Sequence, residues 1–294
     1  MRHLLAGSMG VALVALSPSQ AAYVAQQPVF RVNTDLVRVD VLVTDGGRRV
    51  AGLTAQDFEL EDNGVRQEIQ LAATAEGVKV VLVLDTSKSV AGRRLDYLKR
   101  AIHSSLTTLG GGDTASLLTF NEQLSLRLDA ERDAANVERA MECVNAGGRT
   151  ALYDALYCAL SLVAQDTGRS LIVLFSDGGD NASFLSRDAV MASVQRSKAT
   201  IYVVGVKNAE LAREGQLRVI ADAGGGNLLW AEDDSHLPSV FASVFDEFRS
   251  RSFLTYTPTG VKRDDGWHRI TVRLKGKPGK VKARPGYFAP PGPA

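Results

Sequence analysis

One carboxylate and two hydroxyls follow an apolar run in the segment VVLVLDTSKS, residues 80–89. The β-branched and leucine residues of this run predict a buried strand that ends at Asp85. Ser87 and Ser89 come next at alternate positions, so we expect one short loop to present all three side chains in the same direction. No base lies nearby in sequence to activate a nucleophile. These hard oxygen donors therefore favour a small divalent cation.

A second apolar run ends in the same way, at Asp177 in the segment LFSDGG, residues 174–179. In an open α/β sheet, ligands bind beyond the carboxyl ends of the strands, where the direction of the connections switches. If the two strands are neighbours, both carboxylates face one crevice. Between them, GGRT at 147–150 predicts a loop that opens a helix, and Thr150 either caps that helix or turns its hydroxyl into the crevice.

Together these segments predict a site with two carboxylates and three hydroxyls. Such a donor set favours Mg²⁺, Mn²⁺ or Ca²⁺ over zinc or copper. Near-octahedral coordination at about 2.0–2.1 Å with retained waters would favour Mg²⁺. Five protein groups leave room for an outside ligand, and a carboxylate from a partner protein suits that position. The candidate metal ligands are Asp85, Ser87, Ser89, Thr150 and Asp177.

Apolar runs alternate with amphipathic segments through the middle of the chain. This alternation predicts βα units, and therefore an α/β fold with a doubly wound, mostly parallel sheet and helices on both faces. The expected strands are 78–84, 115–120, 124–128, 170–176, 200–206 and 227–230. The expected helices are 93–109, 132–143, 151–164, 186–197, 209–223 and 237–248.

The segments on either side of this region have β character. In residues 36–43, valines alternate with other residues and predict one buried face. Turn signals such as Asn63-Gly64 and Pro285-Gly286 separate short strands. Neither segment is large enough to form a secure core alone. We therefore expect segments 29–76 and 251–289 to form one small β-sandwich, with the α/β domain at 77–250 inserted into it.

The motifs resemble a known family. DTSKS at 85–89, the threonine of GGRT and FSDG at 175–178 resemble the metal-ion-dependent adhesion site of von Willebrand factor type A domains, over about residues 77–250. The resemblance implies that the five candidate residues bind a cation, with no departure among them. The flanks resemble a group of exported bacterial proteins called VWFA-related, through VAGL at 50–53 and RPGY at 284–287.

The N-terminus predicts export. A short positive start, an apolar run at 4–16 and small residues before Ala21 are typical of a signal peptide at 1–21. No later run is apolar and long enough to span a membrane. We therefore expect an exported protein, periplasmic or extracellular. With 34 basic and 33 acidic residues among 294, no charge surplus points to nucleic acid.

The chain has only two cysteines, Cys143 and Cys158. They flank the loop that contains Thr150. In an exported protein they could form a disulfide that tethers this loop, or remain two small buried side chains. The sequence leaves both alternatives open.

Catalytic motifs are absent from the sequence. The four histidines show no ligand spacing for zinc, and there is no nucleophile elbow, Walker loop or dinucleotide fingerprint. Asp85 resembles the aspartate of haloacid-dehalogenase-type phosphatases, but Ser87 stands where those enzymes have their acid. We interpret the chain as a cation-dependent protein-binding module and not as an enzyme. The alternatives are a structural envelope protein in which the metal only braces loops, and a metal-dependent phosphatase.

Overall fold

The structure is a computed structural model that describes residues 36–72, 77–166, 168–177, 179–207, 214–262 and 266–289. The predicted signal peptide at 1–21 lies outside these residues. Within them, no helix is long and apolar enough to cross a membrane.

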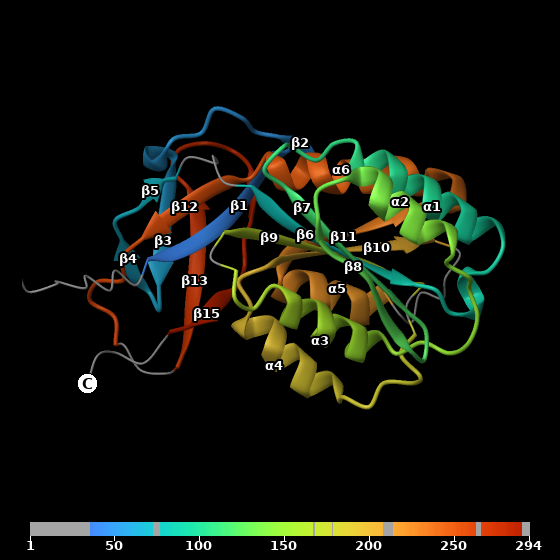
Figure 1. Ribbon diagram of the computed structural model, residues 1–294. Coiled ribbons are helices and arrows are strands. Elements are labelled where there is room, and N and C mark those ends of the chain that lie inside the picture. Colours follow the sequence, from blue (N-terminus) through green and yellow to red (C-terminus); the bar gives the residue numbers. More distant parts are fainter. Residues whose placement is uncertain are drawn as a thin grey trace, which may run out of the picture. The chain divides into compact units, whose positions relative to one another are not determined.

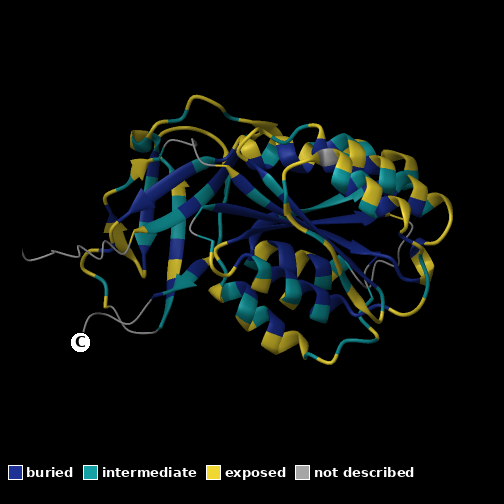
Figure 2. Ribbon diagram, viewed as in Figure 1, coloured by how far each residue is buried: buried dark blue, intermediate teal, exposed yellow. Residues whose placement is uncertain are grey.

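A six-stranded sheet forms the centre of the α/β region (Figure 1). Its order is β11-β10-β9-β6-β7-β8, and every neighbouring pair is parallel except β7 and β8. The inner strands are mostly apolar and almost entirely buried (Figure 2), as expected when helices cover both faces of a parallel sheet. The strands are β6 (Val78–Asp85), β7 (Thr114–Phe120), β8 (Leu124–Glu131), β9 (Arg169–Phe175), β10 (Thr200–Val206) and β11 (Gly225–Ala231).

Helices cover both faces of this sheet, so there are two apolar cores (Figure 1). One face packs against α1 (Arg93–Leu106), α2 (Ala134–Glu142) and α6 (Leu237–Arg249). The other packs against α3 (Leu152–Leu162), α4 (Arg187–Arg196) and α5 (Glu214–Ala223). The doubly wound α/β fold predicted from the sequence is confirmed.

The flanking segments form two antiparallel sheets around a third apolar core. One sheet has the order β14-β1-β12-β5, with β2 on β1, and the other β15-β13-β3-β4. Each sheet joins N-terminal to C-terminal strands, because β1 pairs with β12 and β3 with β13. The predicted sandwich of both segments is thus confirmed. The strands are β1 (Val37–Asp45), β2 (Arg48–Arg49), β3 (Phe58–Asp62), β4 (Val65–Gln67), β5 (Gln70–Leu71), β12 (Ser252–Tyr256), β13 (Trp267–Leu274), β14 (Lys280–Lys282) and β15 (Gly286–Phe288).

A buried arginine joins the sandwich to the α/β region. Arg169, at the start of β9, donates to Asp40 Oδ1 on β1 from Nε at 3.0 Å and Nη2 at 2.7 Å. Its guanidinium lies 4.3 Å from the ring centroid of Phe248 at the end of α6. The positive charge of Arg169 is therefore buried between the sandwich and the α/β region, where the ion pair and the aromatic contact compensate it.

Both cysteines are free thiols in the structure. Cys143 ends α2 and is exposed, and Cys158 lies half-buried in α3, where burial raises the pKa of its thiol. The two cysteines are therefore unpaired, but the alternative of two small buried side chains is wrong for Cys143, which is exposed. The loop around Thr150 is therefore held by other contacts, which are described below.

Candidate functional site

The candidate residues lie where the winding of the sheet reverses. The chain runs from β6 outward through β7 and β8, then returns to β9 on the other side of β6. Leu84 and Phe175 are register partners on these neighbouring parallel strands, so the residues that follow them emerge side by side. This is the position at which open α/β sheets bind ligands. Asp85 ends β6, and Ser176 and Asp177 follow β9 directly.

Asp85 is a completely buried carboxylate. Its Oδ1 accepts the backbone N–H of Ser87 at 2.8 Å, and its Oδ2 accepts the hydroxyl of Ser176 at 2.8 Å. Burial raises the pKa of Asp85 to about 6, and the charge of nearby Asp177 adds to this rise, while the hydrogen bonds oppose it. The described residues place no cationic side chain in hydrogen-bond contact with it.

The two serines belong to the turn after β6. Ser87 is buried and precedes the short 3-10 helix η2 (Lys88–Val90), whereas Ser89 is exposed within it. Their hydroxyl oxygens are 3.1 Å apart. The 147–148 loop holds this turn in place. The backbone N–H of Lys88 donates to Gly148 O at 3.1 Å, and that of Gly147 donates to Thr86 O at 2.8 Å. The serines therefore lie at a fixed position between the buried Asp85 and solvent.

Thr150 is buried just before α3, but it does not cap this helix. The N-cap position is Ala151, and the hydroxyl of Ser183 accepts the N–H groups of Tyr153 and Asp154 at 3.0 and 3.2 Å. The alternative in which Thr150 is the helix cap is therefore wrong. Its backbone instead exchanges hydrogen bonds with Asn181, at 2.8 and 2.9 Å, which ties the 147–150 loop to the loop after β9.

Asp177 has a cationic partner that the sequence motifs did not indicate. Arg94, near the start of α1, donates from Nη1 to Asp177 Oδ2 at 3.2 Å and from Nε to Asp234 Oδ1 at 2.7 Å. Asp234 begins the short 3-10 helix η4 (Asp234–His236) that leads into α6. Arg94 is shared by the two carboxylates and offsets part of the charge of Asp177, whereas the hydrogen-bond partners of Asp85 are neutral.

The donor chemistry of these residues fits a hard divalent cation. Carboxylate and hydroxyl oxygens are the donors that Mg²⁺, Mn²⁺ and Ca²⁺ prefer. A cation near Asp85 would relieve the cost of burying its charge, and exposed Ser89 leaves the site open to solvent. Within the described ranges, no three His, Cys, Asp or Glu side chains gather as metal ligands, so the candidate site depends on its hydroxyl oxygens as well as its two carboxylates.

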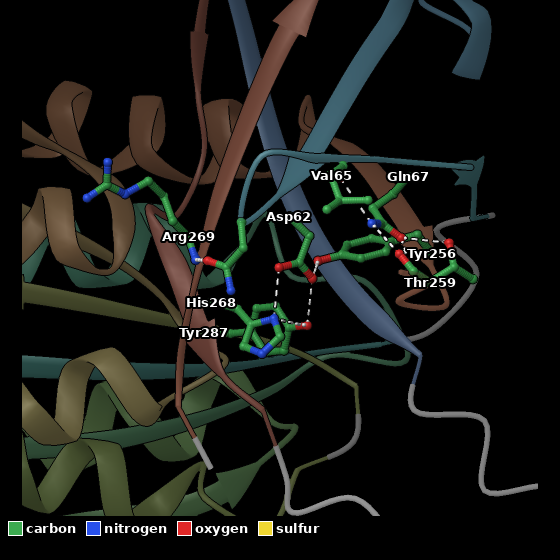
Figure 3. Close-up of polar contacts among 9 residues, drawn as sticks. Asp62, Val65, Gln67, Tyr256, Thr259, His268, Arg269 and Tyr287 are labelled. Carbon is green, nitrogen blue, oxygen red and sulfur yellow. Dashed lines mark hydrogen bonds and ion pairs between the residues drawn. The ribbon is translucent and has the colours of Figure 1, made fainter. Parts of the chain in front are cut away.

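Sequence patterns also missed a polar cluster inside the sandwich (Figure 3). Asp62 on β3 is completely buried, and its Oδ1 lies 2.8 Å from His268 Nδ1. Its Oδ2 accepts the hydroxyls of Tyr256 at 3.0 Å and Tyr287 at 2.9 Å. The four residues come from four short strands, and no spacing along the chain could have grouped them. Asp62, Tyr256 and His268 are buried and Tyr287 is half-buried, and the contacts among them satisfy both oxygens of the carboxylate.

Comparisons with known proteins agree with this architecture. Residues 80–179 match the sequence model of the von Willebrand factor type A domain. Inter-alpha-trypsin inhibitor heavy chain H4 of Sus scrofa is 26% identical over 129 residues, which are 40% of this chain and 14% of the relative. An uncharacterized protein of Synechocystis is 26% identical over 176 residues, 57% of this chain and 41% of the relative. The chain thus spans less than half the length of these two curated relatives.

Solved structures show the same fold at low identity. A von Willebrand factor type A protein from Catenulispora acidiphila has a TM-score of 0.54 at 17% identity, covering 81% of this chain and 74% of that one. The vWF domain of a type V pilus tip protein from Porphyromonas gingivalis has a TM-score of 0.51 at 14% identity, covering 60% of this chain and 96% of that one.

A proximal thread matrix protein of the mussel byssus, described with a zinc-occupied metal-ion-dependent adhesion site, has a TM-score of 0.54 at 17% identity, over 64% of this chain and 49% of that one. The sheet order, the position of the site at its switch point and the sequence match lead to the same assignment. Residues 80–179 match the von Willebrand factor type A domain, and the α/β region that contains them has the fold of such domains.

Proposed function

We propose that this chain is an exported, divalent-cation-dependent protein-binding module and has no catalytic activity. Asp85, Ser87, Ser89, Thr150 and Asp177 would hold the cation, with Mg²⁺ as the first choice and Mn²⁺ or Ca²⁺ as the alternatives. The partner would be a protein that offers an acidic side chain. The mussel protein with zinc at the corresponding motif and the pilus-tip relative support a metal-dependent binding role.

One observation supports this proposal most strongly. Asp85 is completely buried beside a second carboxylate, and its pKa is raised to about 6 by burial first and by Asp177 in addition. A carboxylate in such surroundings destabilises the protein at neutral pH unless a positive charge joins it. Ser87, Ser89 and Thr150 surround it with neutral oxygen donors, which complete a ligand set without adding negative charge.

The coordination of the cation leaves a position for a ligand from the partner. A bound divalent cation would act as a Lewis acid that accepts one more anionic oxygen. Arg94 is shared between Asp177 and Asp234, so these three side chains carry about one net negative charge, and Asp85 adds a second. A divalent cation would balance these charges, so the preference for an acidic partner rests on the coordination position left for an outside ligand, which a carboxylate oxygen suits as a hard donor.

The loops at this edge are already connected without a metal, which disfavours the role of a mere brace. Backbone hydrogen bonds join the 86–88 turn to the 147–148 loop, and Ala151 N donates to Asn121 O at 2.8 Å. Asn181 binds Thr150 from the other side. A cation is therefore not required to hold these segments together, and its contribution is better explained by ligand binding.

Cation binding is tested by calorimetric titration of the purified protein with Mg²⁺ and Mn²⁺. Wild type should bind one ion, and Asp85→Asn should abolish binding while keeping the shape of the side chain. Asp246→Asn, at an exposed position on α6, is the matched control and should bind like wild type. Equal binding by wild type and Asp85→Asn would refute the assignment of the site.

Partner binding is tested by capture from an extract of the native source in Mg²⁺ and in EDTA. We expect proteins that are retained in Mg²⁺, released by EDTA and not retained by Asp85→Asn. Retention that is insensitive to EDTA would contradict a metal-dependent module. Phosphatase turnover that is lost in Asp85→Asn would instead revive the enzyme alternative.

A further inference from the structure

Phe184 is the most exposed large apolar side chain among the described residues. It is 97% exposed, and the next, Tyr157 on α3, is 46% exposed. Single exposed apolar residues are common on protein surfaces, so exposure alone indicates little. What distinguishes Phe184 is its position in the loop after Asp177 and the number of hydrogen bonds that hold this loop.

The loop around Phe184 has a fixed backbone. Asp154 accepts the N–H of Phe184 at Oδ2 and that of Leu185 at Oδ1, both at 2.9 Å. Ser183 accepts two N–H groups of α3 and donates to Asp180 Oδ1 at 2.5 Å. Leu185 packs against the apolar core beneath. The fold thus holds an exposed aromatic residue on a fixed backbone. The loop would therefore lose little additional backbone entropy when a ligand covers Phe184.

Phe184 lies close to the candidate metal site. It follows Asn181, which is hydrogen-bonded to Thr150, by three residues. Three residues of chain span at most about 11 Å when fully extended. An extended partner segment that places an acidic side chain at the site would therefore reach Phe184 with a residue about three positions away.

The exposed charges beside the site favour an acidic segment. Lys88 lies between the two candidate serines, and Arg149 immediately precedes Thr150; both are exposed. Arg149 Nη1 is 3.5 Å from Asn181 O, so this cation lies against the loop that contains Phe184. One exposed carboxylate, Glu122, accepts the N–H of Arg149 at 2.6 Å. Half-buried Asp180, which accepts the hydroxyl of Ser183, is a second carboxylate beside this loop, so the two cations would attract a negatively charged partner together with the proposed divalent cation.

We propose that Phe184 is an anchor for an extended, acidic partner segment. The segment would carry an Asp or Glu at the cation and a large apolar side chain, about three residues away, that packs on the ring of Phe184. This inference rests on the proposed function and adds the sequence chemistry of the partner. Aromatic anchors fixed on a rigid backbone are the residues that contribute most to binding at protein interfaces.

The test is a selection of random linear peptides displayed on phage against the full protein in Mg²⁺, with elution by EDTA. Four baits are compared: wild type, Phe184→Ser, Tyr157→Ser as the matched exposed aromatic, and Asp85→Asn. Wild type and Tyr157→Ser should both select peptides with an acidic residue and a large apolar residue at a constant spacing. Phe184→Ser should select the acidic residue without the constant apolar position.

Affinity measurements complete the test. The synthetic peptide best selected by wild type should bind Phe184→Ser about 10 to 100 times more weakly, and Tyr157→Ser equally well. Mg²⁺ affinity should be the same in all three, which would show that the site itself is intact.

The two proposals fail in different ways. Acidic peptides eluted by EDTA that show the same apolar position with Phe184→Ser would overturn the role of Phe184 and leave the metal module standing. Identical peptides from wild type and Asp85→Asn would overturn the metal-dependent function itself. An unchanged affinity of the selected peptide for Phe184→Ser would also reject the anchor.

Discussion

Asp62 and Asp85 are both completely buried, but their surroundings differ. Asp62 lies in the sandwich, where an imidazole and two tyrosine hydroxyls contact its two oxygens (Figure 3). Asp85 lies at the edge of the α/β sheet, with one backbone N–H, one serine hydroxyl and a second carboxylate nearby. The first carboxylate is satisfied from within the chain, and the second is stabilised only in part.

We interpret this difference as a structural use of Asp62 and, with the proposed metal site, a functional use of Asp85. Asp62 precedes the inserted domain in the chain and its three partners follow it, so the cluster stabilises the pairing of the two segments. The hydrogen-bond partners of Asp85, the N–H of Ser87 and the hydroxyl of Ser176, are both neutral. A protein can keep a carboxylate in such surroundings only at a cost in stability, and such costs are concentrated at functional sites.

The largest effect should come from removing the carboxylate of the sandwich. Asp62→Asn leaves His268 and the two tyrosine hydroxyls without an anionic acceptor inside the core, and it should lower the free energy of unfolding by about 3–5 kcal/mol. Urea denaturation at neutral pH measures this value. Asp246→Asn is the control, and a loss below about 1 kcal/mol would contradict the structural role of Asp62.

Asp85→Asn should have the opposite effect in the metal-free protein, because it should raise the free energy of unfolding. The pKa of Asp85 is raised from 3.8 to about 6 in the folded state, so its ionisation destabilises the fold as the pH rises through about 6. In EDTA at pH 8, Asp85→Asn should therefore be more stable than wild type, by up to about 3 kcal/mol.

The pH dependence gives the control for this prediction. Below about pH 4, Asp85 is protonated in both states, and the stabilities of wild type and Asp85→Asn should converge. Denaturation in EDTA at several pH values measures the difference and cancels the contributions of all other groups. A constant difference from pH 4 to 8 would show that Asp85 is not the titrating carboxylate.

Removing one donor from the sandwich cluster should have a moderate effect. Tyr256 is buried, and burial raises the pKa of its hydroxyl, with Tyr287 and Asp62 adding to the rise. Tyr256→Phe removes one hydrogen bond to Asp62 and leaves two partners, so we expect a loss of about 2 kcal/mol. Thermal or urea unfolding tests this, and a loss equal to that of Asp62→Asn would mean that the cluster depends on this one hydroxyl.

The smallest effect should come from the cation beside Asp177. Arg94→Met keeps much of the side-chain length but removes a positive charge, and it should tighten Mn²⁺ binding about tenfold, or about 1.4 kcal/mol. Calorimetry measures the affinity. Arg100→Met, on an exposed part of the same helix, should leave it unchanged. Weaker binding in Arg94→Met would mean that this arginine positions Asp177 and does not compete with the ion.

The sequence predicted the fold and the position of the site for physical reasons. Parallel strands buried on both faces are continuous apolar runs, and such runs end visibly at Asp85 and near Asp177. The glycine-rich loop before Thr150 indicated the third segment. Whether all five residues bind a cation remains a prediction. It was also predictable that the two flanks would combine, because each alone was too small to form a core.

Contacts between distant, unpatterned residues could not be predicted in this way. Arg94 meets Asp177 from a helix 83 positions away, and nothing in its local sequence marks it. Ser183 replaces Thr150 as the group that caps α3 because the loop after β9 folds back over the start of that helix. The cluster around Asp62 breaks the rule that inward positions of a strand are apolar, so alternation of residue types could not indicate it.

The pairing of β1 with β12 has a consequence for the order of folding. Val39 and Leu254 are register partners, and the whole α/β domain lies between them in the chain. During synthesis, β1 emerges long before its partner exists, and closing so large a loop in an unfolded chain is slow. The inserted domain can form its own contacts first and bring the two ends together. We therefore expect the sandwich to form last, after the inserted domain has folded.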